Sequence, residues 1–370
     1  MSVDRIRAEK QVNTEETKKK GILTGRSDRR KKKRAPRAAK ERLLHDNQIL
    51  LNRFEVAGLI GGGGFAQIYQ CTDTETKNTV AVKVEPTSMS VKRMKLEITV
   101  LLTLRGREGI PYVIGQGKLP NSHYLIFQLV GRNLSDIRRQ LPNKVFSDRT
   151  LYRAMYQVLR ALSLTHGAGF LHRDLKPSNC CIGTVDVTKI YLIDFGLTRQ
   201  YLDKGDTVRK PRATVGMRGT VRYMSLDAHA RRDLGPNNDL IAFLYTTIEL
   251  GDGSLPWTQT RTADDILKLK QSFSGEKLCA NRPKLAKFAE YIDGLSYESI
   301  PDYEKMLGML EACNPPDLTE MEPYDWQKHP CNLDHVLHKQ TTHENTGGDE
   351  GTNVGAKKSP TGSAPMKKPV

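Results

Sequence analysis

The stretch from residue 170 to 183, FLHRDLKPSNCCIG, gathers an acid, a base and an amide between apolar flanks. Asp174 can accept a proton from a hydroxyl group, Lys176 can neutralise charge on a migrating phosphoryl group, and Asn179 offers an amide oxygen to a cation. Fifteen residues later, Asp194 follows an apolar run in LIDFGL and can hold Mg²⁺ against phosphate oxygens. Each motif alone is also typical of a surface loop. In this order, together, they predict phosphoryl transfer.

A glycine-rich loop precedes this stretch. The segment LIGGGGFAQIY (residues 59–69) has four consecutive glycines between strand-like runs, and Lys83 follows Gly61 by 22 residues. The loop joins two strands and does not open a helix, so it is not a Rossmann fingerprint, and it lacks the G-K-[ST] ending of a P-loop. A flexible turn is the alternative, but the context favours a loop that covers nucleotide phosphates.

Ala66 stands where a third glycine of a G-x-G-x-x-G loop is expected. If that position needs a positive φ, the methyl group costs about 1–2 kcal/mol, and if φ is negative it costs little. Lys83 lies in the alternating strand VAVKVE, where an unpaired ammonium is costly to bury. Glu97 or a nucleotide phosphate is the expected partner, unless Lys83 lies on an exposed strand face.

The periodicity of the middle region predicts an α+β fold. Residues 54–60, 66–73 and 78–85 have the β-branched residues and turn breaks of antiparallel strands. Residues 90–104 and 150–169 instead have apolar residues at helical spacing. We therefore expect a small sheet lobe with one helix, followed by a larger helical lobe.

The net charge of +16 is concentrated at the N-terminus, because residues 1–42 carry 16 Lys and Arg against 6 Asp and Glu. We expect disordered tails at residues 1–45 and 340–370. Within the first, RRKKKRAPR (residues 29–37) is a candidate nuclear-localisation signal or a contact for microtubules or nucleic acid, with a solvated tail as the alternative.

The cysteines, the apolar runs and the N-terminus indicate in which cellular compartment the protein is expected. The six cysteines form no C-x-x-C pair, which is typical of reduced thiols in an intracellular protein without a cysteine metal site. The longest apolar run, residues 240–250, is interrupted by polar residues, so we expect a buried helix and no membrane span. The N-terminus has no signal-peptide core. We expect a cytoplasmic monomer, with the nucleus as an alternative location.

These motifs together resemble the protein-kinase signature. HRDLKPSN and GTVRYMSLDAH are similar to the casein kinase 1 superfamily. GGGGF-QIY, QLVGRNLSDIRR and DFGLTRQY…RGTVRY resemble its tau-tubulin kinase branch. The resemblance covers residues 54–328 and implies a bilobal protein kinase fold, with an N-lobe at about 54–131 and a C-lobe at about 132–328. It also implies transfer of the γ-phosphate of ATP, with Mg²⁺, to serine or threonine hydroxyls of proteins.

The resemblance also implies residue roles. Asp174 would be the catalytic base, bonded near Thr220, and Lys176 would contact the γ-phosphate. Lys83, paired with Glu97, would bind the α- and β-phosphates. Asn179 and Asp194 would hold Mg²⁺, and Asp239 would brace the catalytic loop. The nucleotide would be lined by Ile60, Gly61, Gly62, Gly63, Gly64, Phe65, Ile68, Ala81, the gatekeeper Phe127, the hinge residues Gln128 and Val130, and Cys181.

The segment from Leu197 to Met224 holds seven basic and two acidic residues and, by resemblance, lies beside the peptide groove. A basic wall favours Ser or Thr near acidic or already phosphorylated residues, with Arg222 and Arg218 as the anion site. Alternatively, these arginines pair with Asp203, Asp206 or a phosphorylated loop threonine. A second alternative for the whole chain is a pseudokinase scaffold that binds nucleotide without turnover.

Overall fold

The structure is a computed structural model that describes residues 41–63, 66–88, 91–319 and 321–335. All of these except Glu41 fall in one contact unit, Arg42–Val370. The expected tails at 1–40 and 340–370, including the basic run 29–37, lie outside the described residues, as do Gly64 and Phe65.

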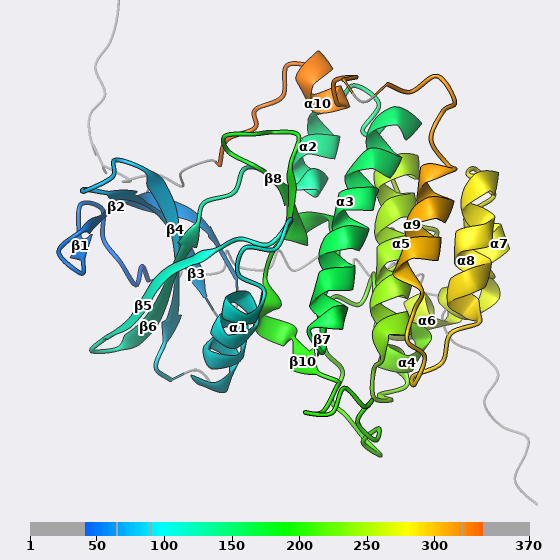
Figure 1. Ribbon diagram of the computed structural model, residues 1–370, viewed down its shortest axis with the longest axis horizontal. Coiled ribbons are helices and arrows are strands. Elements are labelled where there is room, and N and C mark those ends of the chain that lie inside the picture. The colour runs from blue at the N-terminus through cyan, green and yellow to red at the C-terminus, as the bar shows by residue number, and fades with distance from the viewer. Residues whose placement is uncertain (1–40, 64–65, 89–90, 320, 336–370) are drawn as a thin grey trace, which may run out of the picture. The chain divides into compact units, whose positions relative to one another are not determined.

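The N-terminal part is a six-stranded antiparallel sheet in the order β1-β2-β3-β4-β6-β5 (Figure 1). Its strands are β1 (Ile49–Leu50), β2 (Phe54–Gly62), β3 (Gln67–Asp73), β4 (Thr79–Pro86), β5 (Val113–Leu119) and β6 (Ser122–Gln128). Alternate residues of β3 are buried, as period-2 patterning predicts. The three strands and the helix expected from the sequence are all present, the helix as α1 (Val91–Thr103).

The C-terminal part is mainly helical, so the predicted α+β class with a sheet lobe and a helical lobe is confirmed. Its helices are α2 (Leu134–Gln140), α3 (Asp148–Gly167), α4 (Leu226–His229), α5 (Pro236–Asp252), α6 (Ala263–Ser272), α7 (Gly275–Leu278), α8 (Ala286–Asp293), α9 (Tyr303–Glu311) and α10 (Asp325–Lys328). Short 3₁₀ helices are η1 (Pro177–Asn179), η2 (Phe195–Leu197) and η3 (Pro283–Leu285), and short strands are β7 (Phe170–Leu171), β8 (Cys180–Ile182), β9 (Ile190–Leu192) and β10 (Arg199–Gln200).

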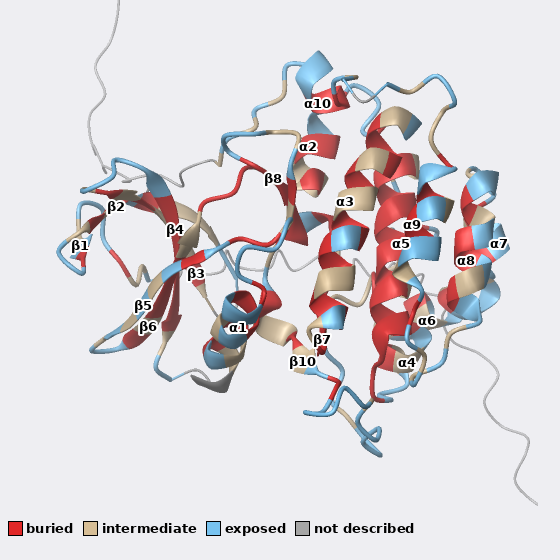
Figure 2. Cartoon of the chain, in the orientation of Figure 1, coloured by how far each residue is buried: buried red, intermediate tan, exposed pale blue. Residues whose placement is uncertain are grey.

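Helix α5 contains the apolar run 240–250 and is buried along nearly its whole length (Figure 2). The run is therefore a buried helix, as expected. In the part of the chain that the structure describes, none of the helices combines the length and apolarity of a membrane span.

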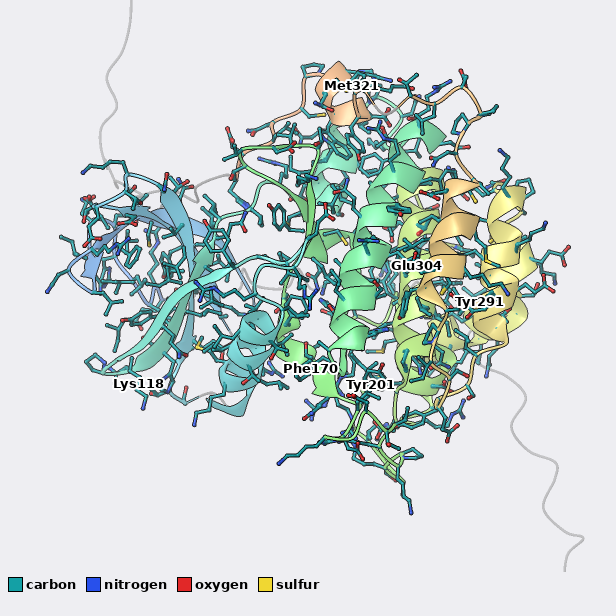
Figure 3. All side chains as sticks on the ribbon, viewed as in Figure 1. Lys118, Phe170, Tyr201, Tyr291, Glu304 and Met321 are labelled. Atoms are coloured by element: carbon teal, nitrogen blue, oxygen red, sulfur yellow. The ribbon has the colours of Figure 1, made fainter. Side chains whose placement is uncertain are left out.

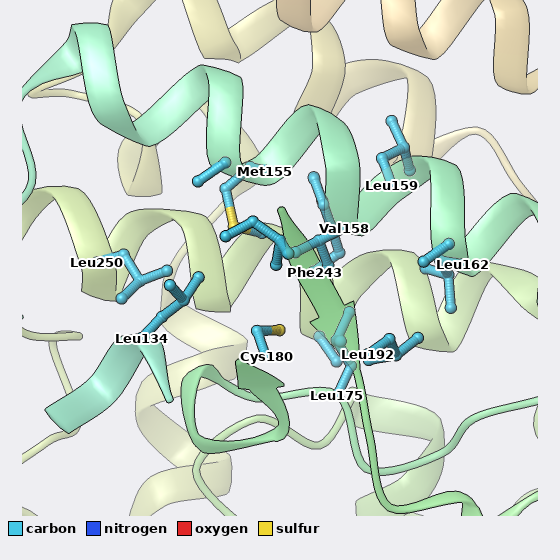
Figure 4. Packing of buried hydrophobic residues seen from close by; sticks show 14 of the residues in the cluster. Leu134, Met155, Val158, Leu159, Leu162, Leu175, Cys180, Leu192, Phe243 and Leu250 are labelled. Atoms are coloured by element: carbon cyan, nitrogen blue, oxygen red, sulfur yellow. The ribbon is translucent and has the colours of Figure 1, made fainter. Parts of the chain in front are cut away.

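The catalytic-loop sequence is anchored in the core at both ends. Leu175 and Cys180 are fully buried and pack among apolar side chains of α3 and α5, including Met155 and Phe243 (Figure 4). At the foot of α3, β7 pairs with β10, and Phe170 and Tyr201 lie close together (Figure 3). This anchoring fixes the polar residues between Leu175 and Cys180 relative to the helices.

Packed residues also lie on both sides of the region expected to form the kinase domain, residues 54–328. Leu44 is fully buried, and its backbone N–H donates to the Tyr69 hydroxyl at 3.0 Å. The packed region therefore begins by residue 42. Leu44 stands in a mostly charged stretch of sequence, but its side chain packs against the sheet. At the other end, residues 329–335 continue along the C-terminal lobe, where Arg132 N–H donates to Leu333 O at 2.9 Å.

Candidate active site

An ion-pair cluster lies between the sheet and the helical lobe. Lys83 Nζ on β4 donates to Glu97 of α1, at 2.9 Å to Oε1 and 2.7 Å to Oε2. The same ammonium lies 3.1 Å from Oδ1 of Asp194. The structure thus brings Lys83 and Glu97 together, and it adds Asp194, 111 residues away in sequence, as a second carboxylate partner.

The charges of Lys83 and Asp194 favour each other's ionised form. Burial alone would lower the pKa of Lys83, but attraction to Glu97 and Asp194 outweighs burial and raises it above its ordinary value. The Lys83 charge lowers the pKa of Asp194 to about 2. At neutral pH, Lys83 is therefore a cation and Asp194 a carboxylate.

Backbone geometry aims Asp194 at the cluster. Its φ of 67° and ψ of 66° are left-handed, a conformation that Asp tolerates better than most residues. A Cβ on Gly196 would lie 3.3 Å from Oδ1 of Asp194 and 3.6 Å from Oε2 of Glu97. The glycine therefore leaves room for the two carboxylates to approach the same ammonium.

Asp174 lies at the centre of a second polar cluster. Its Oδ1 accepts a hydrogen bond from the Thr220 hydroxyl at 2.8 Å, and its Oδ2 accepts one from Lys176 Nζ at 2.5 Å. Lys176 also donates to the Thr220 hydroxyl at 2.9 Å. Asn179 Nδ2 donates to the backbone carbonyl of Asp174 at 2.8 Å, so the amide is oriented by the loop itself.

Asp239 on α5 braces this loop from below. It is 3% exposed, and its two oxygens accept from the backbone N–H groups of His172 and Arg173, at 2.7 Å each. His166 Nε2 lies 3.0 Å from Oδ2 of Asp239. Arg173 has a positive φ of 64°, so these bonds also hold a left-handed backbone conformation that is costly for a non-glycine residue.

A cavity of about 810 Å³ opens between the lobes, and its lining contains the first cluster together with Asp174 and Asn179 of the second, but neither Lys176 nor Thr220. This volume is that of a small-molecule site. Ten of the residues predicted to bind nucleotide line it, namely Ile60, Gly61, Gly62, Gly63, Ile68, Ala81, Lys83, Phe127, Val130 and Cys181. Gln128 does not line it. The backbone N–H of Gln128 donates to Tyr112 O at 2.9 Å.

Several lining residues were not predicted from the sequence. They are Glu85, Arg93, Leu101, Pro111, Arg132, Asn133, Asp136, Ser178 and His335 among others. Asp136 and Asn133 follow the hinge within QLVGRNLSD, a motif that could have signalled them. His335 lies far beyond every motif, and no pattern in the sequence pointed to it.

The basic segment 197–224 is partly neutralised, but by other acids than those expected. Arg199 and Arg212 each lie 3.0 Å from the Asp233 carboxylate. Asp203 instead accepts backbone bonds within its own turn, from Gly205 N at 2.9 Å and Thr207 N at 3.0 Å. Asp203, one of the partners in the alternative to an anion site, thus accepts bonds within its own turn and forms none of the ion pairs found among the described residues.

The two predicted anion-site arginines differ in their surroundings. Arg222 Nη1 lies 3.3 Å from Oε1 of Glu249, a buried carboxylate that also accepts from the Tyr223 hydroxyl at 2.6 Å. Arg218 is exposed and lines a small recess together with Asp174 and Thr220. Among the described carboxylates, none forms an ion pair with Arg218.

The segment 220–224 is held from beneath by two side chains. Lys270 Nζ donates to the carbonyl oxygens of Val221 at 2.8 Å and Met224 at 2.6 Å. Trp257 Nε1 donates to the carbonyl oxygen of Arg222 at 2.8 Å. Because Thr220 directly bonds Asp174, these contacts link α6 and the chain segment before it to the Asp174 cluster through one short loop.

Comparison with known proteins matches residues 54–308 to the protein kinase domain family. The chain is similar to a Dictyostelium discoideum protein named as a probable serine/threonine-protein kinase, 33% identical over 286 residues, which are 75% of this chain and 57% of the relative. This chain thus spans just over half the length of that relative.

Two Caenorhabditis elegans proteins are also similar. One, whose name assigns it to casein kinase I, is 32% identical over 308 residues, covering 80% of this chain and 89% of the relative. The other, the serine/threonine-protein kinase spe-6, is 30% identical over 315 residues, covering 81% and 82%.

Proposed function

This chain belongs to the protein kinase family, and we propose that it is an active serine/threonine kinase of the casein kinase 1 type that resembles the tau-tubulin kinase branch. It transfers the γ-phosphoryl group of ATP to protein hydroxyls. The observation that carries this proposal is the joint geometry of two clusters in one cavity. Lys83 is paired with Glu97 at 2.7 Å, and Asp174 is bonded to both Lys176 and Thr220.

Asp174 orients the incoming serine or threonine hydroxyl and accepts its proton, because its carboxylate is fixed by two donors at the cavity wall. Lys176, 2.5 Å from Asp174, supplies positive charge where the transferred phosphoryl group gains negative charge. Lys83 binds the non-transferred phosphates while Glu97 fixes its position. Positioning and charge neutralisation supply most of the rate.

The donor set at the cavity floor fits a hard divalent cation. Asp194 is ionised and its side chain is 46% exposed toward the cavity, while Asn179 has its amide nitrogen engaged by Asp174 O, which leaves its oxygen available. An oxygen-only pair is the ligand type that Mg²⁺ prefers, with phosphate oxygens and water completing the shell. Bound there, Mg²⁺ would neutralise phosphate charge; Asn179 and Asp194 would hold it.

We further propose that the preferred substrates carry acidic or phosphorylated residues near the acceptor hydroxyl. Arg218 supports this, because its exposed guanidinium lies in a recess beside Asp174 without a carboxylate partner among the described residues. Arg222 adjoins it but shares its charge with Glu249. A guanidinium binds carboxylate or phosphate through paired, charge-assisted hydrogen bonds.

The test is phosphate transfer from ATP to casein by the wild-type chain and by Asp174→Asn, with ADP-induced thermal stabilisation measured for both. We expect transfer to fall by at least about a thousandfold in the variant, the range reported for loss of a positioned base plus its charge. Nucleotide stabilisation should persist. Equal transfer by both proteins would refute the proposed reaction. Nucleotide binding by the wild type without transfer to any substrate would favour the pseudokinase scaffold.

A further inference from the structure

After α10 the chain continues as a packed segment that returns to the hinge near Val130. We call residues 331–335 the strap. Figure 1 shows this last coloured segment descending from α10 toward the sheet. It lies outside residues 54–308, which match the kinase family.

The strap is fixed at several points along the hinge side. The Arg132 backbone N–H donates to Leu333 O at 2.9 Å, and its guanidinium donates to Asp334 O at 3.1 and 2.6 Å. Gln140 on α2 makes a reciprocal pair with Asn332, at 2.8 and 3.2 Å. These bonds give the strap one position relative to the cavity mouth.

The strap ends with His335 in the cavity lining, alongside Val130, Arg132 and Asp136. Burial lowers the pKa of His335, and the opposing effect of the nearby Val130 backbone is smaller, so the ring is neutral at pH 7. A neutral imidazole has one donor and one acceptor nitrogen. His335 in the cavity lining can therefore offer either role to a hydroxyl or amine of a ligand.

The direction in which a nucleotide would lie follows from the charged clusters. Lys83 and Asp194 attract phosphates at the inner end of the cavity, so the base and sugar occupy the hinge end, where His335 lies. The cavity retains about 810 Å³ with His335 in its wall, which is ample for a nucleotide. The strap is thus a wall of the cavity and not a plug in it.

We propose that the strap is part of the nucleotide site and that His335 contacts the bound nucleoside at the hinge end of the cavity. This inference rests on the proposed kinase function, because it takes the ligand to be ATP or ADP. The strap raises nucleotide affinity through this contact.

The experiment is calorimetric titration of the full chain with Mg·ADP, comparing wild type, His335→Ala, His335→Gln and His329→Ala. His329 is an exposed histidine just before the strap and does not line the cavity, so it is the matched control. We expect His335→Ala to weaken binding about three- to tenfold, as for loss of one neutral hydrogen bond. His335→Gln keeps a donor and an acceptor and should bind within about twofold of wild type.

Steady-state kinetics give the second measurement. The KM for ATP should rise in His335→Ala, while kcat at saturating ATP and the KM for casein stay unchanged. Equal Mg·ADP affinity of His335→Ala and wild type would overturn the inference, and so would tighter binding by the variant, which would make the strap an obstruction. If the wild type itself binds no nucleotide, the proposed kinase function fails instead.

Discussion

Lys270 Nζ lies 2.6 Å from the carbonyl oxygen of Met224, and the ammonium is buried on α6 beneath the loop that carries Thr220. The faces of Tyr245 and Trp257 lie 5.2 Å from the same nitrogen. Carbonyl oxygens and aromatic faces thus replace a carboxylate partner for this buried cation. Lys270 is placed to fix the backbone of residues 221–224 beside the catalytic cluster.

Replacing Lys270 with methionine should therefore loosen the loop. The carbonyls of Val221 and Met224 lose their donor, each at a cost of about 1–3 kcal/mol when left buried and unpaired. We expect the KM for a protein substrate to rise about five- to tenfold while the KM for ATP stays within about twofold, as expected when about 1–1.4 kcal/mol of protein-substrate binding is lost. Lys268→Met, on the exposed face of the same helix, is the control, and similar kinetics for both variants would contradict this role.

The protonation of Lys270 predicts a pH dependence of stability. Burial lowers its pKa to about 7 from an ordinary value of 10.5. Between these values the unfolded chain binds the proton more tightly than the folded chain, so the free energy of unfolding rises with pH across that window. A neutral amine still donates to both carbonyls. The Tm of wild type minus that of Lys270→Met should increase from pH 7 to pH 9, whereas a constant difference would be evidence against a shifted lysine.

The sequence predicted the parts of the site that are local in the chain. Asp174, Lys176 and Asn179 lie within six residues, and short-range spacing together with strand and helix periodicity was enough to place them. Contacts between distant segments left no such signal. In the sequence DILKLKQS, Lys270 has the pattern of an exposed lysine on a helix. The Arg212–Asp233 pair joins residues that are 21 positions apart, in segments without regular secondary structure. His335 reaches the cavity only because Arg132 and Gln140 hold the strap.

Asp239→Asn should destabilise the folded chain. Both oxygens of Asp239 accept from backbone N–H groups at 2.7 Å, so an amide NH₂ must face one of these donors. We expect the free energy of unfolding to fall by about 2–4 kcal/mol, the range for breaking a buried, charge-assisted hydrogen bond. Urea denaturation measures this, with Asp264→Asn on the exposed surface of α6 as control. Equal midpoints for the two variants would show that Asp239 does not brace the loop.

Arg218→Glu should impair acidic substrates selectively. The reversal places a carboxylate in the recess beside Asp174, where we propose that substrate anions bind. We expect the KM for an acidic peptide to rise about tenfold at low salt, and the effect to shrink at 0.5 M salt because exposed charges are screened. Lys118→Glu, at the far tip of the sheet (Figure 3), changes net charge equally and should leave KM unchanged. An equal effect of both reversals would indicate a general field and no specific site.

The structure indicates how much the alanine at position 66 costs the glycine loop. Ala66 is not among the described non-glycine residues with a positive φ, so its methyl group carries no left-handed strain. Its carbonyl accepts the Gly63 N–H at 2.9 Å, a backbone bond that any residue can make. Glycine at this position adds only chain freedom, worth about 0.5–1 kcal/mol. Ala66→Gly should therefore keep kcat/KM for ATP within about threefold of wild type, without the gain expected for relief of strain.

The matched variant is Gly62→Ala, in the same loop. A Cβ on Gly62 would lie 3.2 Å from the Ala66 carbonyl oxygen, so the hairpin must shift to admit it. We expect Gly62→Ala to raise the KM for ATP by about tenfold, equivalent to 1.4 kcal/mol, because the loop backbone moves away from the phosphates. A tenfold gain in Ala66→Gly, or no loss in Gly62→Ala, would mean that the loop closes on nucleotide in a conformation where residue 66 takes a positive φ.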